Sequence, residues 1–339
     1  MREVLFYYPS KINLTKIKSN FFYDNRKNIL LSFLFFIILI SSLNGYFKIY
    51  QKGLIPLKEI NFFISGSVKW LLLFGLSSVS CILIFLEIRY FKKIFNLTIF
   101  IFLFESFLSS LSMISRGMIF NSLSIIYGIY KFSKKTGKFL NINIFLKLIT
   151  VCGILFYMSV ILVNEIRAEY FYIGKSRIDT LEKKNLNKDK TNFNFLNYNS
   201  EFFYIATNRW VGIDAIFAVA QNKDKLGEDL LREAFNENFQ KELPTFYEKT
   251  FNLKNVNNST TEIHENAKGN TLTGIIAFLF YSGSLIFLFI GMLILIIFAN
   301  LLEFISFKVS GKNLIFCSLI GQIVAFRFIH FGYLPKQSY

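Results

Sequence analysis

Apolar runs long enough to cross a bilayer as helices recur along this chain, and they constrain its fold more than any other feature. A bilayer core needs about 20 apolar residues for each helix that crosses it. Hydrophobic residues make up 53% of the 339 residues, and the mean hydropathy is +0.43. The sequence therefore predicts an all-α polytopic integral membrane protein.

We expect about seven or more transmembrane helices, at residues 29–47, 70–88, 97–115, 117–131, 144–164, 272–307 and 314–331. The fourth segment is short. From Gly117 to Lys131 it makes about 21 Å of helix, whereas the apolar core of a bilayer is about 30 Å thick. It should therefore be a short, tilted or re-entrant helix.

The C-terminal apolar region contains small residues that predict breaks and contacts. The sixth segment is too long for one untilted helix, so it should tilt, extend past the bilayer or kink near Gly283 or Gly291. In the seventh segment, Gly321 and Ala325 have the small-xxx-small spacing that suits helix contact.

A polar stretch, residues 165–270, interrupts the apolar runs. It holds 15 Lys and Arg and 16 Asp and Glu, a net charge of −1, whereas the rest of the chain carries a net charge of +17. This contrast indicates a soluble insert on a basic, apolar body. We therefore divide the chain into an N-terminal membrane region with about five spans (1–164), a large external loop (165–270) and a C-terminal membrane region with about two spans (271–339).

Two segments of this loop are predicted to be amphipathic helices. Apolar residues recur at helical spacing in residues 201–220, and again in residues 226–241, where they alternate with charged residues. The second helix should end before Pro244. We expect the two helices to pack together or to lie on the membrane surface.

The distribution of basic residues predicts the orientation in the membrane. Residues 1–28 contain six Lys and Arg against two acidic residues, which favours a cytoplasmic N-terminus. Four Lys between the first two spans argue against this orientation. Five crossings would bring the large loop to the periplasmic side of a bacterial inner (cytoplasmic) membrane. Because the excess charge lies beside apolar runs, it suits membrane lipid better than nucleic acid.

The sequence lacks the patterns of metal, redox and nucleotide chemistry. Cys81, Cys152 and Cys317 fall within apolar runs, no Cys-x-x-Cys occurs, and His264 and His330 are the only histidines. The cysteines are therefore interpreted as packing residues, and no metal or other cofactor is expected. The absence of Walker, Gly-x-Gly-x-x-Gly, His-Glu-x-x-His and Gly-x-Ser-x-Gly motifs excludes nucleotide-fuelled pumps and hydrolases of those kinds.

A carboxylate lies inside the third apolar segment. Glu105, Ser109, Ser112 and Arg116 follow one another at i, i+4, i+7 and i+11, which predicts that they share one helical face. Because a charge is costly to bury in lipid, Glu105 should face protein or water. It is either a functional group or a structural carboxylate that is hydrogen-bonded to its serines or paired with Arg116.

Four separate parts of the chain are predicted to bring cationic groups to the external membrane surface. These candidate binding residues are Arg116, Arg167, Arg177, Arg209 with Trp210, and Arg327 with Tyr333. Guanidinium groups offer rigid donors that suit phosphate oxygens, so the expected ligand is anionic and lipid-anchored, such as a lipid diphosphate. Glu105 or Asp214 would act as a general base or position an acceptor hydroxyl, and His330 is a third candidate catalytic group.

Each of these residues also has a structural interpretation. The arginines can anchor the chain at the interface by extending toward lipid headgroups, or be solvated in loops. Asp214 can be a charge on a helix surface, and His330 can cap a helix end.

The chain resembles the O-antigen polymerase (Wzy-type) family, the oligosaccharide repeat unit polymerases. The residues that carry the resemblance are 105–117 (Glu105-Ser-Phe-Leu-Ser-Ser-Leu-Ser-Met-Ile-Ser-Arg116-Gly117), 208–214 (Asn208-Arg-Trp-Val-Gly-Ile-Asp214) and 327–333 (Arg327-Phe-Ile-His-Phe-Gly-Tyr333). These motifs cover less than a tenth of the chain. The remainder of the likeness is architectural: many apolar spans and a large external loop near the C-terminal end. Seven spans are fewer than members of this family usually show.

The resemblance implies a polymerase that joins repeat units carried on undecaprenyl diphosphate into a surface polysaccharide at the periplasmic face. The growing chain would move from its lipid carrier onto the non-reducing end of the next unit. Arg116 and Arg209 would bind diphosphate or sugar, and the leaving diphosphate would be stabilised electrostatically, without a metal. A chain-length regulator and a flippase are the protein partners that the resemblance implies.

Two other function classes remain open on the sequence. One is another glycosyltransferase or ligase that uses a polyprenyl-linked donor and differs in its acceptor. The other is a transporter or flippase for such a lipid, or a membrane scaffold. A flippase should place its polar residues along a cavity at mid-membrane, whereas most candidates here are predicted at the outer surface, which favours chemistry there.

Overall fold

The computed structural model describes residues 20–51, 61–91, 93–136, 142–171, 216–217, 219–220, 225, 227, 229–236 and 274–325. Within these ranges the chain is helical and contains no strand. It divides into two compact units, which we describe separately. The first consists chiefly of residues 1–171 and 300–323, and the second chiefly of residues 172–263 and 268–299.

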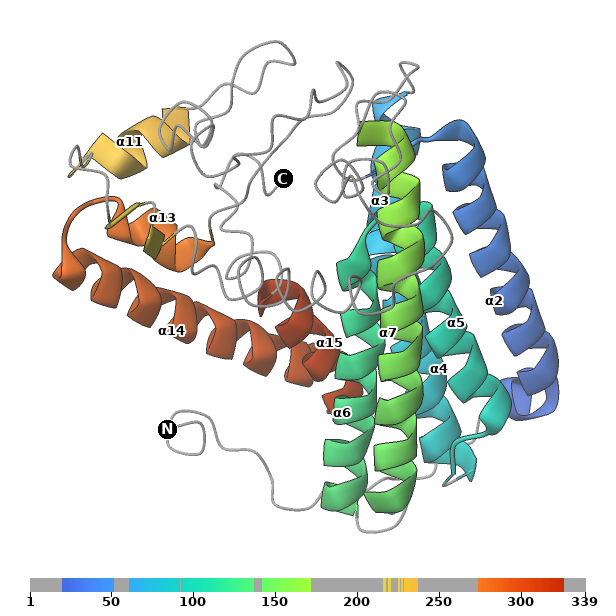
Figure 1. Ribbon diagram of the computed structural model, residues 1–339. Helices are drawn as coiled ribbons and strands as arrows, with labels where there is room; N and C mark the ends of the chain where they lie inside the picture. The colour runs from blue at the N-terminus through green and yellow to red at the C-terminus, as the bar shows by residue number, and fades with distance from the viewer. Residues whose placement is uncertain are drawn as a thin grey trace. The chain divides into compact units, whose positions relative to one another are not determined.

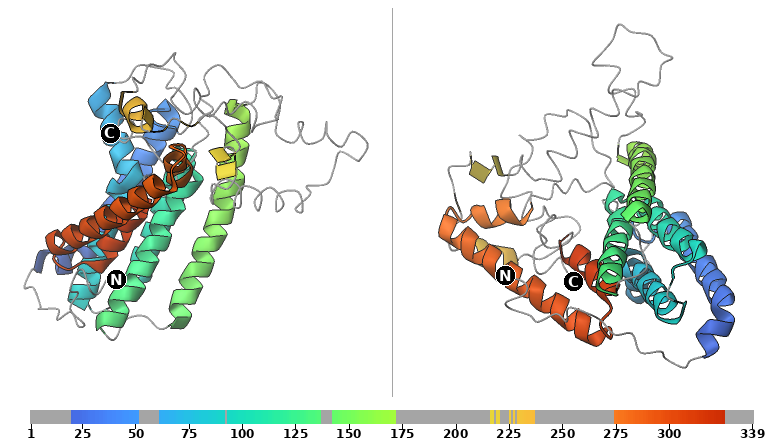
Figure 2. Two further views of the ribbon diagram at one scale, coloured as in Figure 1. Left: turned by 90° about the vertical axis from the view of Figure 1, so that its left-hand side faces the viewer. Right: turned by 90° about the horizontal axis from the view of Figure 1, so that it is seen from below.

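The first unit is an antiparallel helix bundle (Figure 1). Its helices in chain order are α2 (Asn20–Phe47), α3 (Phe62–Trp70), α4 (Leu76–Phe91), α5 (Asn96–Ser112), α6 (Ile119–Thr136) and α7 (Ile142–Phe171). A single π-helical turn, η1 (Leu71–Gly75), joins α3 to α4 without a break. Helix α5 contacts α2, α4, α6 and α7 and is therefore the central helix. Figure 2 shows the same bundle from two further directions.

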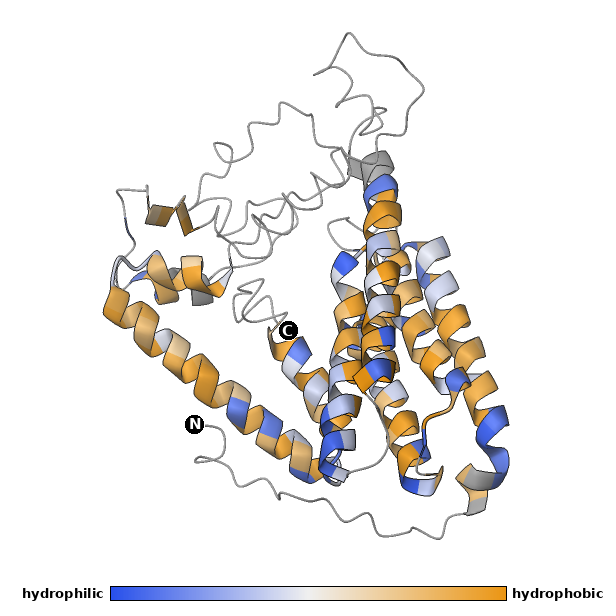
Figure 3. Cartoon of the chain, turned by 60° about the horizontal axis from the view of Figure 1, so that its bottom comes forward, coloured by the Kyte–Doolittle hydropathy of each residue, from blue (hydrophilic) through white to orange (hydrophobic). Residues whose placement is uncertain are grey.

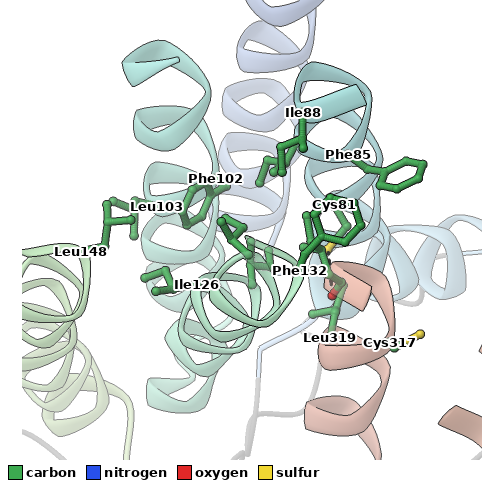
Figure 4. Close-up of a cluster of buried hydrophobic side chains, with 14 of the residues drawn as sticks. Cys81, Phe85, Ile88, Phe102, Leu103, Ile126, Phe132, Leu148, Cys317 and Leu319 are labelled. Atoms are coloured by element: carbon green, nitrogen blue, oxygen red, sulfur yellow. Dashed lines mark hydrogen bonds between the residues drawn. The ribbon is translucent and has the colours of Figure 1, made fainter. Parts of the chain in front are cut away.

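Two apolar clusters fill the bundle on either side of α5. One joins α4, α5, α6 and α7 to the C-terminal helix α15 (Leu314–Val324), and Figure 4 shows Phe102 and Phe132 in it together with Cys81 and Leu319. The other joins α2, α3, α4 and the two ends of the α5–α6 connection through Leu30, Ile37, Leu72, Met113 and Met118. The three cysteines are free and buried, as expected for packing residues.

The long apolar helices indicate a membrane-embedded protein. Four of them are long and apolar enough to cross a bilayer: Asp24–Phe47, Phe63–Phe91, Ile142–Ile166 and Leu285–Val309. The helices α5 and α15 are apolar but shorter. The predicted first, second, third and fifth segments thus correspond to α2, α3–α4, α5 and α7. The predicted total of seven spans or more, the membrane orientation and the external loop stay predictions.

Helix α6 is longer than the sequence indicated. It has 18 residues, which make about 27 Å of helix rather than about 21 Å. The difference arises because Lys131, Lys134 and Lys135 lie within its last turns instead of ending it. Basic side chains are favourable there, because they face the negative end of the helix dipole and can extend their charge outward.

The long C-terminal apolar segment is broken at Gly283, one of the two predicted positions. Helix α13 (Ile275–Phe280) is followed by a turn in which Gly283 has φ 79°, and then by α14 (Leu285–Val309). Gly291, the other candidate, continues within α14. In Figure 3, α14 is coloured as hydrophobic along most of its length, and no residue of its most apolar window is buried.

The second unit contains the described part of the predicted amphipathic pair. Residues 216–217 and 219–220 are helical, and α11 spans Asp229–Asn236. Val219 and Leu230, one from each segment, are buried in a single cluster with residues of α13. The prediction that the two segments pack together is confirmed for these residues.

The predicted helix contact at Gly321 is wrong for the described part of the chain. A Cβ atom added at Gly321 would meet nothing within 4 Å. The close contact on α15 is made by Gly128 of α6 instead, where a Cβ would lie 2.7 Å from the Ile315 Cα and 3.0 Å from the Ser318 Cβ. The Ser318 hydroxyl also donates to the Ser124 carbonyl at 2.7 Å. The spacing within α15 did not reveal that the small residue stands on the other helix.

We predict that Gly128→Ala destabilises the protein by about 1–3 kcal/mol, because the new methyl group overlaps backbone that cannot rotate away. Gly321→Ala is the matched control on the partner helix, since its methyl group meets no neighbour and alanine favours helix by about 1 kcal/mol. Thermal unfolding of the purified variants in detergent measures both. Equal stabilities would contradict the α6–α15 contact.

Candidate functional site

The connection between α5 and α6 is a buried break in helical structure. Helix α5 ends at Ser112, and a 3₁₀ turn, η2 (Arg116–Met118), precedes α6. Between them Met113, Ile114 and Ser115 are all buried. Ile114 has φ 52°, a left-handed conformation that is unusual for a β-branched residue and persists where surrounding contacts fix it.

Serine side chains replace part of the helical hydrogen bonding at the break. The Ser115 amide donates to the Ser110 carbonyl at 2.9 Å, and the Ser110 hydroxyl donates to the Ser115 carbonyl at 2.8 Å. The Ser110 hydroxyl is also hydrogen-bonded to the Ser159 hydroxyl of α7. The break is therefore tied to α7, which runs alongside α5 in the same direction (Figure 1).

An asparagine of α2 holds the end of α5 from the other side. The Asn44 amide group lies 2.9 Å from the Ser112 carbonyl and 2.8 Å from the Ser112 hydroxyl, and it donates to the Tyr50 carbonyl at 3.1 Å. Its oxygen accepts from the Tyr50 amide at 2.8 Å. The Ser112 hydroxyl in turn donates to the Ser41 carbonyl at 2.9 Å. Asn44 is fully buried, so these bonds link α2, the chain after it and α5.

Several buried polar atoms near the break have no hydrogen-bond partner within the described residues. They are the Ser41 hydroxyl and the side-chain amide oxygens of Gln51 and Asn164. Ser41 and Gln51 adjoin the Asn44–Ser112 contacts. Asn164 follows Ser159 by five residues, about 7.5 Å along α7, on the face that also buries Val160 and Val163. Buried polar groups are normally hydrogen-bonded, so these atoms are available to a polar ligand.

Arg116 lies at this break and not where the sequence placed it. The spacing predicted a continuous helical face from Glu105 to Arg116, but the helix ends at Ser112 and the left-handed Ile114 redirects the chain. The prediction of a shared face therefore holds for Glu105, Ser109 and Ser112, which all belong to α5, and is wrong for Arg116. Arg116 is half-buried in η2, which contacts α7.

Glu105 lies inside the bundle and is fully buried. Its carboxylate accepts from the hydroxyls of Ser77 on α4 at 3.0 Å, Ser106 at 3.3 Å and Ser109 at 3.2 Å. Two residues of α6 extend this network: the Asn121 amide donates to the Ser77 hydroxyl at 3.1 Å, and the Ser122 hydroxyl to that of Ser106 at 2.6 Å. The carboxylate thus connects α4, α5 and α6. The prediction that it faces protein is confirmed.

The energetics of this network are closely balanced. Moving a carboxylate out of water costs several kcal/mol even after relaxation. Each hydrogen bond to a charged group contributes about 1.5–3 kcal/mol, so three hydroxyl donors offset a cost of that size. Glu105 precedes Ser112 by seven residues, so it lies about 10 Å of helix below the break.

A second buried carboxylate marks the opposite end of the bundle. Glu87 accepts from the Arg26 guanidinium at 2.6 Å, from the Thr98 hydroxyl at 2.5 Å and from the Phe95 amide at 3.2 Å. The Arg26 guanidinium also stacks 3.6 Å from the centre of the Phe95 ring. Glu87 and Arg26 were not among the site residues predicted from the sequence. Glu87 could have been recognised from the sequence as a carboxylate near the end of an apolar run.

The polar residues that hydrogen-bond to the Glu105 network and to the break from neighbouring helices were also not predicted from the sequence. These residues are Asn44, Ser77, Asn121, Ser122 and Ser159. Each is a single small polar residue within an apolar run, a pattern that also occurs where side chains are only solvated by their own helix. Their pairing depends on how the helices pack, which the spacing within one helix does not contain.

Most of the predicted binding and catalytic residues lie outside the described ranges. These are Arg177, Arg209, Trp210, Asp214, Arg327, His330 and Tyr333. Arg167 belongs to α7, four residues before its end. No group of three or more His, Cys, Asp and Glu that suits a metal ion occurs within the described ranges. No family model, curated protein or solved structure matches the chain.

We predict that Asn44→Ala loosens the break, because it removes the donor to Ser112 and leaves buried backbone groups unpaired at about 1–3 kcal/mol each. Amide hydrogen exchange of residues 112–118 should become faster in the purified protein. Asn25→Ala is the matched control, because the Asn25 amide donates only to the Phe21 carbonyl of its own helix and is exposed to solvent. Unchanged exchange in Asn44→Ala would show that this contact does not hold the break.

Proposed function

We propose that this protein is a glycosyltransferase-type polymerase that joins polyprenyl-diphosphate-linked oligosaccharide repeat units into a surface polysaccharide at the periplasmic face of the membrane. One observation carries the proposal. The central helix of an apolar bundle is interrupted by a polar break that bears Arg116 and is bordered by the buried polar groups of Ser41, Gln51 and Asn164. A substrate with an anionic anchor and many hydroxyls has the chemistry that such a break suits.

The diphosphate is the group that Arg116 would bind. A guanidinium presents several donors in a fixed plane and stays charged at every working pH. Arg116 is half-buried, and a charge interaction is stronger where protein and lipid exclude water. Helix α7, which contacts η2, leads directly into the polar stretch that contains Arg177 and Arg209. Arg177 and Arg209, which the sequence predicts as further binding residues, stay candidate donors for a diphosphate.

The glycan is the part of the substrate that the neutral polar groups would bind. Hydroxyl and amide side chains can both donate and accept, which suits sugar hydroxyls. Ser41, Gln51 and Asn164 each have a buried oxygen that no described residue engages. A sugar hydroxyl would satisfy such an oxygen.

The reaction would be a direct displacement at the anomeric carbon of the growing chain. A hydroxyl at the non-reducing end of the incoming unit forms the new bond to that carbon, and the bond from the carbon to the diphosphate oxygen breaks. The departing lipid diphosphate keeps the electron pair, and Arg116 and Arg209 would stabilise its charge. Asp214 would take the proton of the attacking hydroxyl, since Glu105 lies about 10 Å of helix below the break. His330 is a second candidate for this role.

We predict that Arg116→Ala and Arg209→Ala each reduce polymerisation by about 100-fold or more, the usual effect of removing a group that stabilises a developing charge. A strain that lacks this protein is complemented with each variant, and surface polysaccharide is separated on a gel. The variants should leave single-unit glycan where wild type restores a ladder.

Arg89→Ala, at the other end of the bundle in the last turn of α4, is the control and should restore the ladder. Membrane abundance of each variant is measured by immunoblot. A ladder in the deletion strain itself would overturn the polymerase proposal.

A transporter or flippase for the same lipid-linked unit is the second candidate, because the Glu105 network is polar and lies midway along α5. The two functions leave different intermediates. Loss of a polymerase should leave single units on the cell surface. Loss of a flippase should leave lipid-linked units that an impermeant oxidant of sugars does not reach from outside intact cells.

A further inference from the structure

The Glu105 network is enclosed by apolar side chains. One turn along α4 from Ser77 is Cys81, and one turn back along α5 from Ser106 is Phe102, and both are fully buried in the cluster that Figure 4 shows. Toward the break, Met113 and Met118 are buried as well. Bulk water therefore does not solvate the carboxylate, and its charge must be balanced within the bundle.

No cationic side chain balances that charge within the described residues. The one ion pair there joins Arg26 to Glu87, at the other end of α4. Glu105 is hydrogen-bonded to three neutral hydroxyls. The two buried carboxylates therefore differ in kind, because one has a permanent counter-charge and the other does not.

The elements packed around α5 present few other titratable groups. The buried residues of α2 and α6 are neutral. Helix α4 contributes the Cys81 thiol and, toward its other end, Glu87, which is paired with Arg26 of α2. Helix α7 contributes the Cys152 thiol, the Cys317 thiol of α15 lies in the same apolar cluster, and η2 carries Arg116 beyond the end of α5. None of these groups forms an ion pair with Glu105 within the described residues, so the carboxylate itself is where the charge can change.

We propose that Glu105, surrounded by the hydroxyls of Ser77, Ser106 and Ser109, is a binding site for one exchangeable proton. A proton is the smallest counter-charge, and it fits because the hydroxyls already contact the carboxylate at 3.0–3.3 Å. Serine hydroxyls donate to an ionised carboxylate and accept from a protonated one. The same side chains can therefore hydrogen-bond to the carboxyl group in both states.

Proton exchange requires no other reactant. The proton comes from water and returns to it, and the bond formed or broken is the O–H bond of the carboxyl group. Ser109, Ser110 and Ser112 follow Glu105 along α5 as far as the break. Their hydroxyls are the polar groups along which the proton would pass between Glu105 and the break. The proposal is independent of glycosyl transfer at the break.

The network would transmit protonation to the packing of three helices. Adding a proton removes the negative charge to which Ser77 and Ser109 donate and reverses at least one of these hydrogen bonds. Through Asn121 and Ser122, the hydroxyls of Ser77 and Ser106 are bonded to α6, the helix that follows the break. The bundle thus contains a charge that can change without the loss of a salt bridge.

The test is infrared difference spectroscopy of the full chain reconstituted in phosphatidylcholine vesicles, recorded between alkaline and acidic pH. Solvent-exposed carboxyl groups also give a carbonyl stretching band at acidic pH, so the band of interest is the one at higher frequency that a carboxylic acid shielded from water gives. We expect this band to appear as the pH falls and to shift in deuterated water. The band should be lost completely in Glu105→Gln. It should persist in Glu87→Gln, the matched control, because Glu87 is paired with the Arg26 guanidinium and lies outside the Glu105 network.

A third variant shows whether the band belongs to this network. Ser109→Ala removes one hydrogen-bond donor, so the carbonyl band should move to higher frequency without being lost. Circular dichroism and gel filtration establish whether each variant is folded. If Glu105→Gln does not fold, the frequency shift in Ser109→Ala is the deciding measurement. A wild-type protein without the band at any pH, or a band that survives in folded Glu105→Gln, would overturn the proposal. No polysaccharide assay enters this test, so its failure is separate from failure of the polymerase proposal.

Discussion

The need to satisfy backbone hydrogen bonds in apolar surroundings is the constraint on which the rest of this bundle depends. Inside a bilayer an unpaired backbone group costs several kcal/mol, so a helix can be interrupted only where side chains or neighbouring helices replace its bonds. At the α5–α6 break, the Ser110 hydroxyl bonds to the Ser115 carbonyl and to Ser159 of α7, and Asn44 of α2 donates to the Ser112 carbonyl. The positions of α2 and α7 around α5 therefore follow from the break.

Small polar residues give this bundle its register. Lipid tails are as apolar as leucine, so burial alone does not select one packing of apolar helices over another. Hydrogen bonds between helices do select one, because a shift of one helix would leave the donors and acceptors unpaired. Ser77 and Asn121 between α4 and α6, Ser106 and Ser122 between α5 and α6, and Ser318 between α15 and α6 act in this way. Gly128 then allows the backbone of α15 to approach α6 closely.

The sequence predicted the helices well and the contacts between them poorly. Apolar runs located α2, α4, α5 and α7, and a glycine located the break before α14, because both depend on local composition. The internal position of Glu105 followed from the cost of exposing a charge to lipid. The shared face of Glu105 and Arg116, the end of α6 and the role of Gly321 were wrong, because each assumed that a pattern within one helix continues unchanged. Asn44 and Ser159 acquire their roles only from helices that are distant in sequence.

The two buried carboxylates in the described part of the bundle differ in a way that distinguishes its two ends. Glu87 is balanced by a guanidinium that stays charged at every working pH, and removing either partner leaves a buried charge, which typically costs about 3–5 kcal/mol. That end is therefore fixed. Glu105 is balanced by hydroxyls, which adapt to either charge state, and it lies on the helix that ends at the polar break. Because a working site must bind and release its ligand without unfolding the protein, the adaptable hydrogen bonds around Glu105 suit function better than the fixed Arg26–Glu87 pair does.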